Sequence, residues 1–203
     1  MIQKKQLEEE NIELKRKIKE QDYLIHSLNI ELTDCKKFSN IDFLTQLANR
    51  ERFQRSLEDI HKMYKNMNIN FCLIYIDLDN FKQVNDKFSH SHGDFVLKKV
   101  AKILTLKNRA HTLIGRLGGE EFGIVIQNVN KETCLRVAER IRESIENETF
   151  DLDIKKVNVT ASIGIYIPEK EDLIEDIIYK ADKAMYFSKN NGKNKVSFYK
   201  EKG

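Results

Sequence analysis

Two adjacent carboxylates, Glu120 and Glu121, follow the glycine pair Gly118 and Gly119 between two short segments with alternating apolar residues. Alternation with a period of two predicts two strands, so these four residues lie where a hairpin reverses. Glycine lacks a Cβ and tolerates positive φ, so backbone can approach a bulky anion closely. Neighbouring acids repel each other unless a cation neutralises them, and hard cations such as Mg²⁺ prefer carboxylate oxygens. The hairpin indicates a metal-phosphate site, although a solvent-exposed turn explains the pattern equally well.

A second acidic position follows a continuously apolar stretch. Residues 71–76 are typical of a central strand that is buried on both faces, and Asp77 comes directly after them. Acids at the carboxyl end of such a strand lie at the sheet edge where sites are built. If this strand and the hairpin are neighbours in one sheet, Asp77, Glu120 and Glu121 converge. With phosphate oxygens and water, they could then bind one or two Mg²⁺ ions.

Other polar residues lie between these two acidic positions. Lys82 is a point charge suited to negative charge that develops on phosphate, and Asn85 and Asp94 could hydrogen-bond a base edge. Asp79 fits better as the N-cap of the next helix than as a metal ligand. His90 has no set of metal ligands at useful spacing and is expected to be an ordinary loop histidine. The residues alone therefore indicate metal-dependent chemistry on a nucleoside polyphosphate.

The elements that must position these residues can be read from periodicity. Helices are expected over 50–63, 81–88, 94–106, 131–146 and 173–188, and strands over 71–76, on both sides of the hairpin, over 157–165 and over 196–198. The strand over 157–165 alternates apolar and polar residues, which predicts a half-buried antiparallel strand. Hairpin-joined strands mixed with crossover helices predict an α+β fold with one mixed central sheet covered by helices.

Composition limits the possible classes of function. The chain has 203 residues, of which 40% are hydrophobic and 33% charged, with a formal net charge of +3. Its basic residues are interspersed, so no nucleic-acid or acidic-lipid partner is expected. Three widely spaced cysteines without a CxxC pair argue against a disulfide framework and a zinc site. No membrane span or secretory signal is visible, and we expect a cytoplasmic protein.

The N-terminal segment has a different pattern. From Leu7 to Cys35 mostly apolar residues recur with 3,4 spacing, without Gly or Pro to end a helix. About four heptads predict a short coiled coil that pairs two chains, with Asn11 fixing the register. Apolar residues off this seam widen the apolar face, which leaves a single helix that packs on its own domain as an alternative. We expect a dimerisation helix over 1–38 and a catalytic domain over 39–203.

Several of these motifs occur together in one known order. The segment from Asp77 to Asp86, followed by His90, Gly93-Asp94 and Gly118 to Phe122, resembles the GGDEF family, the diguanylate cyclases of bacteria. The resemblance covers about residues 40 to 200. It implies a fold like the palm of nucleotide cyclases and polymerases. It also implies condensation of two GTP into cyclic di-GMP with release of two pyrophosphates, by a homodimer that uses Mg²⁺ or Mn²⁺.

The resemblance assigns catalytic and metal-binding roles by position. Asp77, the backbone carbonyl of Leu78 and Glu120 would hold Mg²⁺, and Glu121 would bind a second ion. Glu120 would also be the base for the ribose 3′-hydroxyl, or, because a carboxylate shared with a metal is a weak base, would act mainly by electrostatic stabilisation. Lys82 would stabilise charge on the phosphates in the transition state.

The substrate contacts follow in the same way. The implied GTP-binding residues are Phe81, Asn85, His90, Asp94, Gly118, Gly119, Lys189 and Lys193. Asp94 would accept from the N1 and N2 donors of guanine, which adenine lacks. Lys193 stands where the family usually has arginine, so bidentate contact with phosphate is lost there.

One departure from the family pattern concerns regulation. The product-inhibition site would use Arg109, which is present, and an acid at the position of Thr112. We therefore expect weakened or absent feedback inhibition by cyclic di-GMP. Every charge used in the chemistry is retained, which favours an active cyclase. The alternative is a catalytically silent GTP-binding regulator that acts through a protein partner.

Overall fold

The computed structural model describes residues 11, 13–29, 40–108, 112–152 and 155–200. The chain divides into two compact units, Met1–Ser39 and Asn40–Gly203. No helix among the described residues is long and apolar enough to cross a membrane.

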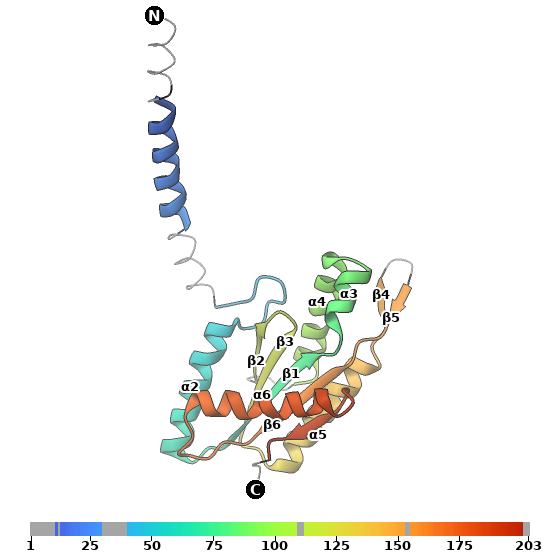
Figure 1. Cartoon of the computed structure of the whole chain (residues 1–203). Helices are drawn as coiled ribbons and strands as arrows, with labels where there is room; N and C mark the ends of the chain where they lie inside the picture. Colours follow the sequence, from blue (N-terminus) through green and yellow to red (C-terminus); the bar gives the residue numbers. More distant parts are fainter. Residues whose placement is uncertain (1–10, 12, 30–39, 109–111, 153–154, 201–203) are drawn as a thin grey trace, which may run out of the picture. The chain divides into compact units, whose positions relative to one another are not determined.

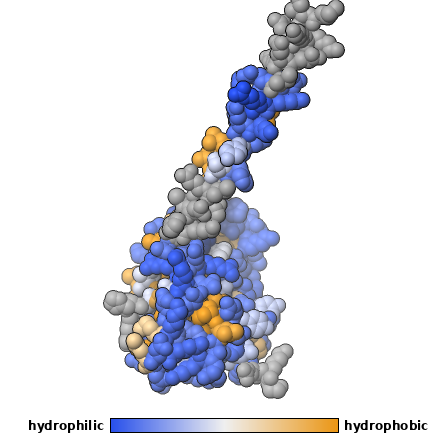
Figure 2. Space-filling view, turned by 90° about the vertical axis from the view of Figure 1, so that its left-hand side faces the viewer, coloured by the Kyte–Doolittle hydropathy of each residue, from blue (hydrophilic) through white to orange (hydrophobic). Residues whose placement is uncertain are grey.

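The first unit is helical over its described residues, 11 and 13–29. Four residues of the predicted seam, Leu14, Ile18, Ile25 and Leu28, are each 53–57% exposed. An apolar patch interrupts the otherwise hydrophilic surface of this helix in Figure 2. The ends of the predicted seam, including Leu7 and Cys35, lie outside the described residues.

The second unit is built on a five-stranded mixed sheet with the order β2-β3-β1-β6-β7. Its strands are β1 (Phe71–Leu78), β2 (Leu113–Gly118), β3 (Glu121–Gln127), β6 (Ala161–Tyr166) and β7 (Val196–Phe198). The central strand β1 is antiparallel to both β3 and β6, and β7 is parallel to β6. All of β1 is buried, which explains its continuous apolar run.

Helices cover both faces of this sheet. They are α2 (Arg50–Met67), α3 (Phe81–Lys87), α4 (His90–Leu106), α5 (Lys131–Glu146) and α6 (Ile174–Asn190). One core cluster contains residues of α3, α4 and α5, and the other contains residues of α2 and α6. Figure 1 shows α6 lying across the sheet. The predicted α+β class, with a mixed sheet covered by helices, is confirmed.

Glycines allow helices to approach the sheet closely. A Cβ on Gly164 of β6 would lie 2.2 Å from the backbone of Ala181 and of Met185, both in α6. The ring of Phe53 from α2 covers Gly115 and Gly123, which face each other on β2 and β3. These contacts fix α2 and α6 against one face of the sheet.

Four details differ from the sequence-based expectations. Helix α2 continues to Met67, four residues beyond the expected end. The segment 157–165 is not one strand, because β5 (Lys155–Val157) pairs with β4 (Phe150–Leu152) in a separate two-stranded sheet. β6 is not half-buried, because α6 covers the face that carries Gly164. Helix α4 begins at His90, four residues before the expected start.

Candidate functional site

The predicted convergence of acids occurs at the carboxyl end of β1. Strands β1 and β3 are neighbours, and Asp77 is the direct cross-strand partner of Glu121. The backbone N–H of Leu78 donates to the carbonyl oxygen of Glu120 over 3.3 Å. Gly119 and Glu120 form the turn itself, while Glu121 is the first residue of β3. One carboxylate therefore lies on the turn and two lie on adjacent strands.

The turn uses its glycines differently from the sequence-based expectation. Neither Gly118 nor Gly119 has a positive φ, so left-handed backbone is not the reason for glycine here. A Cβ on Gly119 would meet no atom within 4 Å, so the space in front of the turn is open. Arg116 braces the turn, since its guanidinium donates to the Gly119 carbonyl and to Asp42. Periodicity did not identify Arg116 and Asp42 as supports of the site.

Asp77 is the most unusual carboxylate of the site. It is only 5% exposed, and Lys189 Nζ lies 2.7 Å from its Oδ2. Its Oδ1 is buried without a hydrogen-bond partner. Burial raises the pKa of Asp77 to about 6, and repulsion from Glu120 and Glu121 acts in the same direction while Lys189 opposes it. The pKa of Glu120 is also raised, chiefly by burial.

These properties fit a hard divalent cation. An unpartnered, buried carboxylate oxygen is costly unless a positive charge approaches it, and Mg²⁺ and Mn²⁺ prefer oxygen ligands. Within the described ranges, no three acidic, histidine or cysteine side chains already form a metal cluster. The carboxylates would thus need to be completed by backbone and ligand oxygens. Lys189 supplies positive charge beside Asp77 in this arrangement.

The two predicted base-reading residues lie on packed helices. The Oδ1 of Asn85 on α3 comes so close to Gly93 on α4 that a Cβ there would lie 2.0 Å away. Asp94 is the next residue of α4 and is exposed. Gly93 thereby brings Asn85 beside the helical turn that carries Asp94. This arrangement fits two polar groups that act on one ligand.

Three other predicted contacts lie on the same two helices. His90 is exposed, but it is the first residue of α4 and not a loop residue as expected. Phe81 is 4% exposed and belongs to the core, so it packs beneath the start of α3 and is not on the surface. Lys82 is exposed in the first turn of α3.

The N-cap role expected for Asp79 is wrong. The N-cap position of α3 is Asn80, in left-handed conformation and without a side-chain cap. The buried carboxylate of Asp79 instead accepts hydrogen bonds from Thr160 Oγ1 and Ser162 Oγ, both at 2.7 Å, and from the Asn194 backbone N–H at 3.0 Å. Its place at the end of a buried strand directs it into the interior, where these donors satisfy it.

The expected phosphate contacts lie at the end of α6 and after it. Lys189 is in the last turn and pairs with Asp77, and Lys193 in the following loop donates to Asn80 Oδ1. Both lysines therefore lie near the carboxyl end of β1. The structure brings these residues, the three carboxylates and the start of α3 to one edge of the sheet.

Comparison with known families agrees with this arrangement. The sequence model described as "Diguanylate cyclase, GGDEF domain" matches residues 39–195. The chain belongs to this family. Diguanylate cyclase A of Treponema denticola is 43% identical over 130 residues, which are 63% of this chain and 35% of that protein. The chain thus spans about a third of that relative's length.

Solved GGDEF structures have the same fold. The active GGEEF domain of a diguanylate cyclase from Vibrio cholerae is 33% identical, with a TM-score of 0.70 over 77% of this chain and 100% of that one. The coiled coil and GGDEF domain of DgcB from Caulobacter crescentus, in complex with cyclic di-GMP, have a TM-score of 0.76 over 91% of this chain and 98% of that one. At 24% identity, the second likeness concerns the fold alone.

The expected product-inhibition site of this GGDEF domain is only partly described. Arg109 lies outside the described residues. Thr112 is partly exposed and directly precedes β2. The expected weakening of product inhibition therefore stays a prediction from the sequence.

Proposed function

We propose that this chain is a Mg²⁺- or Mn²⁺-dependent diguanylate cyclase that condenses two GTP into cyclic di-GMP and two pyrophosphates. The observation that carries the proposal is the buried Asp77, with an unpartnered Oδ1, on the strand beside Glu121 and next to the turn residue Glu120. Membership in the GGDEF family supports the substrate class.

The acids at the end of β1 are the proposed metal ligands. Asp77, the carbonyl of Leu78 and Glu120 would hold one ion, and Glu121 would serve a second. A divalent cation held by these residues would neutralise charge on the triphosphate and favour in-line displacement. The orphan Oδ1 of Asp77 is the structural feature that supports this ligand set.

The other residues bind and orient the substrate. Asn85 and Asp94 would bind the guanine edge, because they project from two helices that touch at Gly93. Lys82 and Lys193 would bind phosphate oxygens, together with Lys189 at the end of α6. His90 and the backbone of Gly118 and Gly119 would line the same pocket.

Glu120 is the proposed proton acceptor. Burial, and to a lesser degree Glu121, raise its pKa while Lys189 opposes them. A cation held by the same carboxylate would lower its basicity, so its other role would be electrostatic stabilisation of the transition state. Glu120 would take the proton of the 3′-hydroxyl as that oxygen bonds to the α-phosphorus of the other GTP. The bond from this phosphorus to pyrophosphate breaks in the same step.

One domain supplies only half of the reaction. Each 3′-hydroxyl must meet the α-phosphate held by another copy, so two domains must face each other. The exposed seam of the N-terminal helix, with Leu14, Ile18, Ile25 and Leu28, supports a coiled coil that provides this proximity. The fold likeness to a coiled coil plus GGDEF domain covers 91% of the chain, more than residues 40–203 alone supply.

The test is turnover of GTP. The purified chain is incubated with GTP and Mg²⁺, and nucleotides are separated by chromatography beside a Glu120→Gln control. We expect cyclic di-GMP and pyrophosphate from the wild type, and a loss of at least about 100-fold in the control, since a proton acceptor contributes about 10²–10⁴-fold. GTP binding by a confirmed dimer without product would instead support the silent regulator.

A further inference from the structure

The loop after α6 has an unusual backbone. Gly192, Lys193 and Asn194 have φ values of 103°, 60° and 44°, so three consecutive residues are left-handed. Residues with a Cβ are disfavoured in this region, although asparagine tolerates it better than lysine. Such a loop keeps one shape only when its surroundings fix it. The contacts of Asn194 show what fixes it.

Asn194 forms hydrogen bonds through its backbone N–H and through both polar atoms of its side chain. Its backbone N–H donates to Asp79 Oδ2 at 3.0 Å. Its side-chain Nδ2 donates to Glu146 Oε1 at 2.6 Å, and its Oδ1 accepts from Arg142 Nη1 at 2.9 Å. The residue that follows Lys193 is thus bonded on one side to the end of β1 and on the other to α5.

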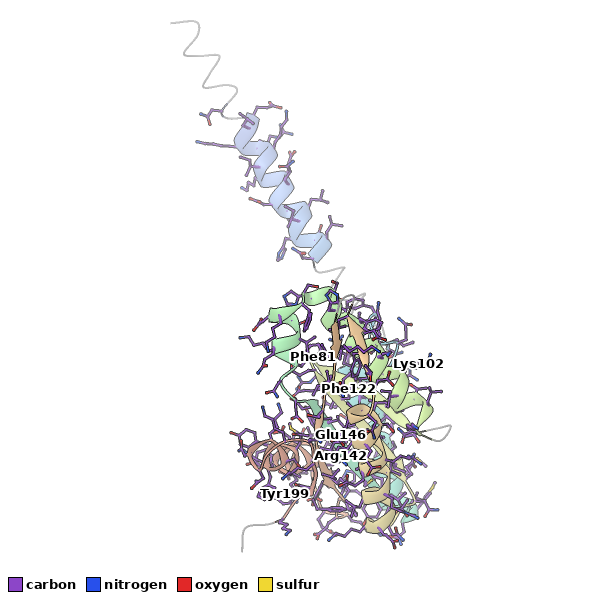
Figure 3. All side chains as sticks on the ribbon, turned by 90° about the vertical axis from the view of Figure 1, so that its right-hand side faces the viewer. Phe81, Lys102, Phe122, Arg142, Glu146 and Tyr199 are labelled. Carbon is purple, nitrogen blue, oxygen red and sulfur yellow. The ribbon has the colours of Figure 1, made fainter. Side chains whose placement is uncertain are left out.

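Both attachment points are themselves held in place. The Arg142 side chain is 14% exposed and bonds Glu139 and Glu146 at 2.7 Å each, and Figure 3 labels Arg142 and Glu146 together on α5. Asp79 is 5% exposed and fixed by Thr160 and Ser162. A network of hydrogen bonds thereby links α5, the loop and the end of β1.

We propose that Arg142, Glu146 and Asn194 are positioning residues that hold Lys193 toward the triphosphate and so set the affinity for GTP. This inference rests on the proposed function. Lys193 lies between Gly192 and the anchored Asn194. Its Nζ donates to Asn80, the N-cap residue of α3, and Lys82 lies in the first turn of that helix. If the loop is released, the lysine spends less time at this place, and GTP binding weakens while the chemical step is unchanged.

A double-mutant cycle tests whether Asn194 acts through Lys193. The variants are Lys193→Ala, Asn194→Gly and the double variant, and glycine is chosen because it keeps access to left-handed φ. Binding of a GTP analogue with a methylene bridge between the α- and β-phosphorus, in Mg²⁺, is measured by calorimetry. We expect each single change to weaken binding about three- to tenfold, and the second change to add less than twofold once the first is present.

The controls separate positioning from general stability. Asn191→Ala removes an amide of the same loop whose Nδ2 donates to the Phe187 carbonyl within α6, and it should change affinity less than twofold. Arg142→Lys keeps the charge but loses the planar guanidinium, whose Nε contacts Glu139 and whose Nη1 donates to both Glu146 and Asn194. It should weaken binding in the same direction and raise KM for GTP with kcat nearly unchanged.

Each outcome bears on a definite claim. Losses that multiply in the double variant, or equal losses from Asn191→Ala, would overturn the positioning role while the wild type still binds. No binding of the analogue by the wild type would overturn the proposed function, and this inference with it.

Discussion

Asp77 combines three features. It is buried, one of its oxygens has no partner, and the other bonds Lys189. An ion pair alone would lower the pKa of an acid, but burial outweighs Lys189 here. The ionised form of Asp77 is therefore disfavoured when no cation is bound. A bound cation would relieve this, which couples folding stability to metal and pH.

The pH dependence of stability tests this coupling. The pKa of Asp77 is raised from 3.8 to about 6, so the folded state holds the proton more tightly than the unfolded chain. The stability that this gives is complete below about 3.8 and is lost as pH rises through about 6, up to about 3 kcal/mol for about two pH units. Asp77→Asn cannot ionise and should gain stability relative to the wild type over this window.

The measurement is the melting temperature of both proteins between pH 4 and pH 7 without metal. Changes in packing at this position shift the variant by a roughly constant amount, and the effect of Lys189 is already contained in the pKa of Asp77, so the informative quantity is the change of the difference with pH. Asp86→Asn, on the exposed surface of α3, serves as the control. Mg²⁺ at pH 7 should stabilise the wild type more than Asp77→Asn. A pH-independent difference would contradict the assignment.

Secondary-structure elements are held at the site by close contacts that only glycine permits. Gly164 lies against the backbone of α6, the helix that ends with Lys189. Gly93 of α4 lies against the side chain of Asn85 in α3. These two glycines set the distances of Lys189 and of the proposed base-reading residues from the acids. The positions of α4 and α6 therefore determine the geometry of the site.

A matched pair of glycine substitutions tests this view. A Cβ at Gly164 would meet α6 backbone at 2.2 Å, whereas one at Gly119 would meet nothing within 4 Å. Gly164→Ala should therefore cost about 3 kcal/mol or more and lower the melting temperature by about 6 °C or more. Gly119→Ala should stay within about 0.5 kcal/mol of the wild type. Similar melting temperatures for the two variants would show that α6 can shift away from β6 at little cost.

Periodicity was sufficient where burial is uniform. The apolar run of β1 and the alternation around the hairpin predicted the strands themselves, because such patterns report burial directly. Convergence of the acids depended on the condition that these strands are neighbours, which the pairing of β1 with β3 meets. Periodicity failed where tertiary contacts determine the role of a residue. Asp79 follows the rule for an N-cap, yet Thr160 and Ser162, about 80 residues later, bind its carboxylate. The role of Asn194 was likewise hidden, because Arg142 and Glu146 meet it only in the fold.

At the scale of the whole molecule, the described part of one chain holds one set of acids and the proposed base-reading pair Asn85 and Asp94. The proposed reaction joins two nucleotides, so its rate depends on how often two domains meet. The described helix over 13–29 presents apolar residues that a second helix would bury. Dimerisation would then raise the effective concentration of the second half-site to the millimolar range. Pairing of this helix should control turnover without changing GTP binding.

Single charges on and off the seam separate these two effects. Ile25 belongs to the predicted seam and is 57% exposed in one chain, and Ser27, two residues later, lies off it. Ile25→Glu places two like charges inside the paired helices and should raise the dimer dissociation constant at least about tenfold, whereas Ser27→Glu adds the same charge outside the pairing and should not. Sedimentation gives the oligomeric state. In the Ile25 variant, activity per chain should fall at low protein concentration and recover as concentration rises, while GTP affinity stays at the wild-type value. Full activity in a chain that sedimentation shows to be monomeric would rule out the coiled coil as the source of proximity and place the contact between the catalytic domains themselves.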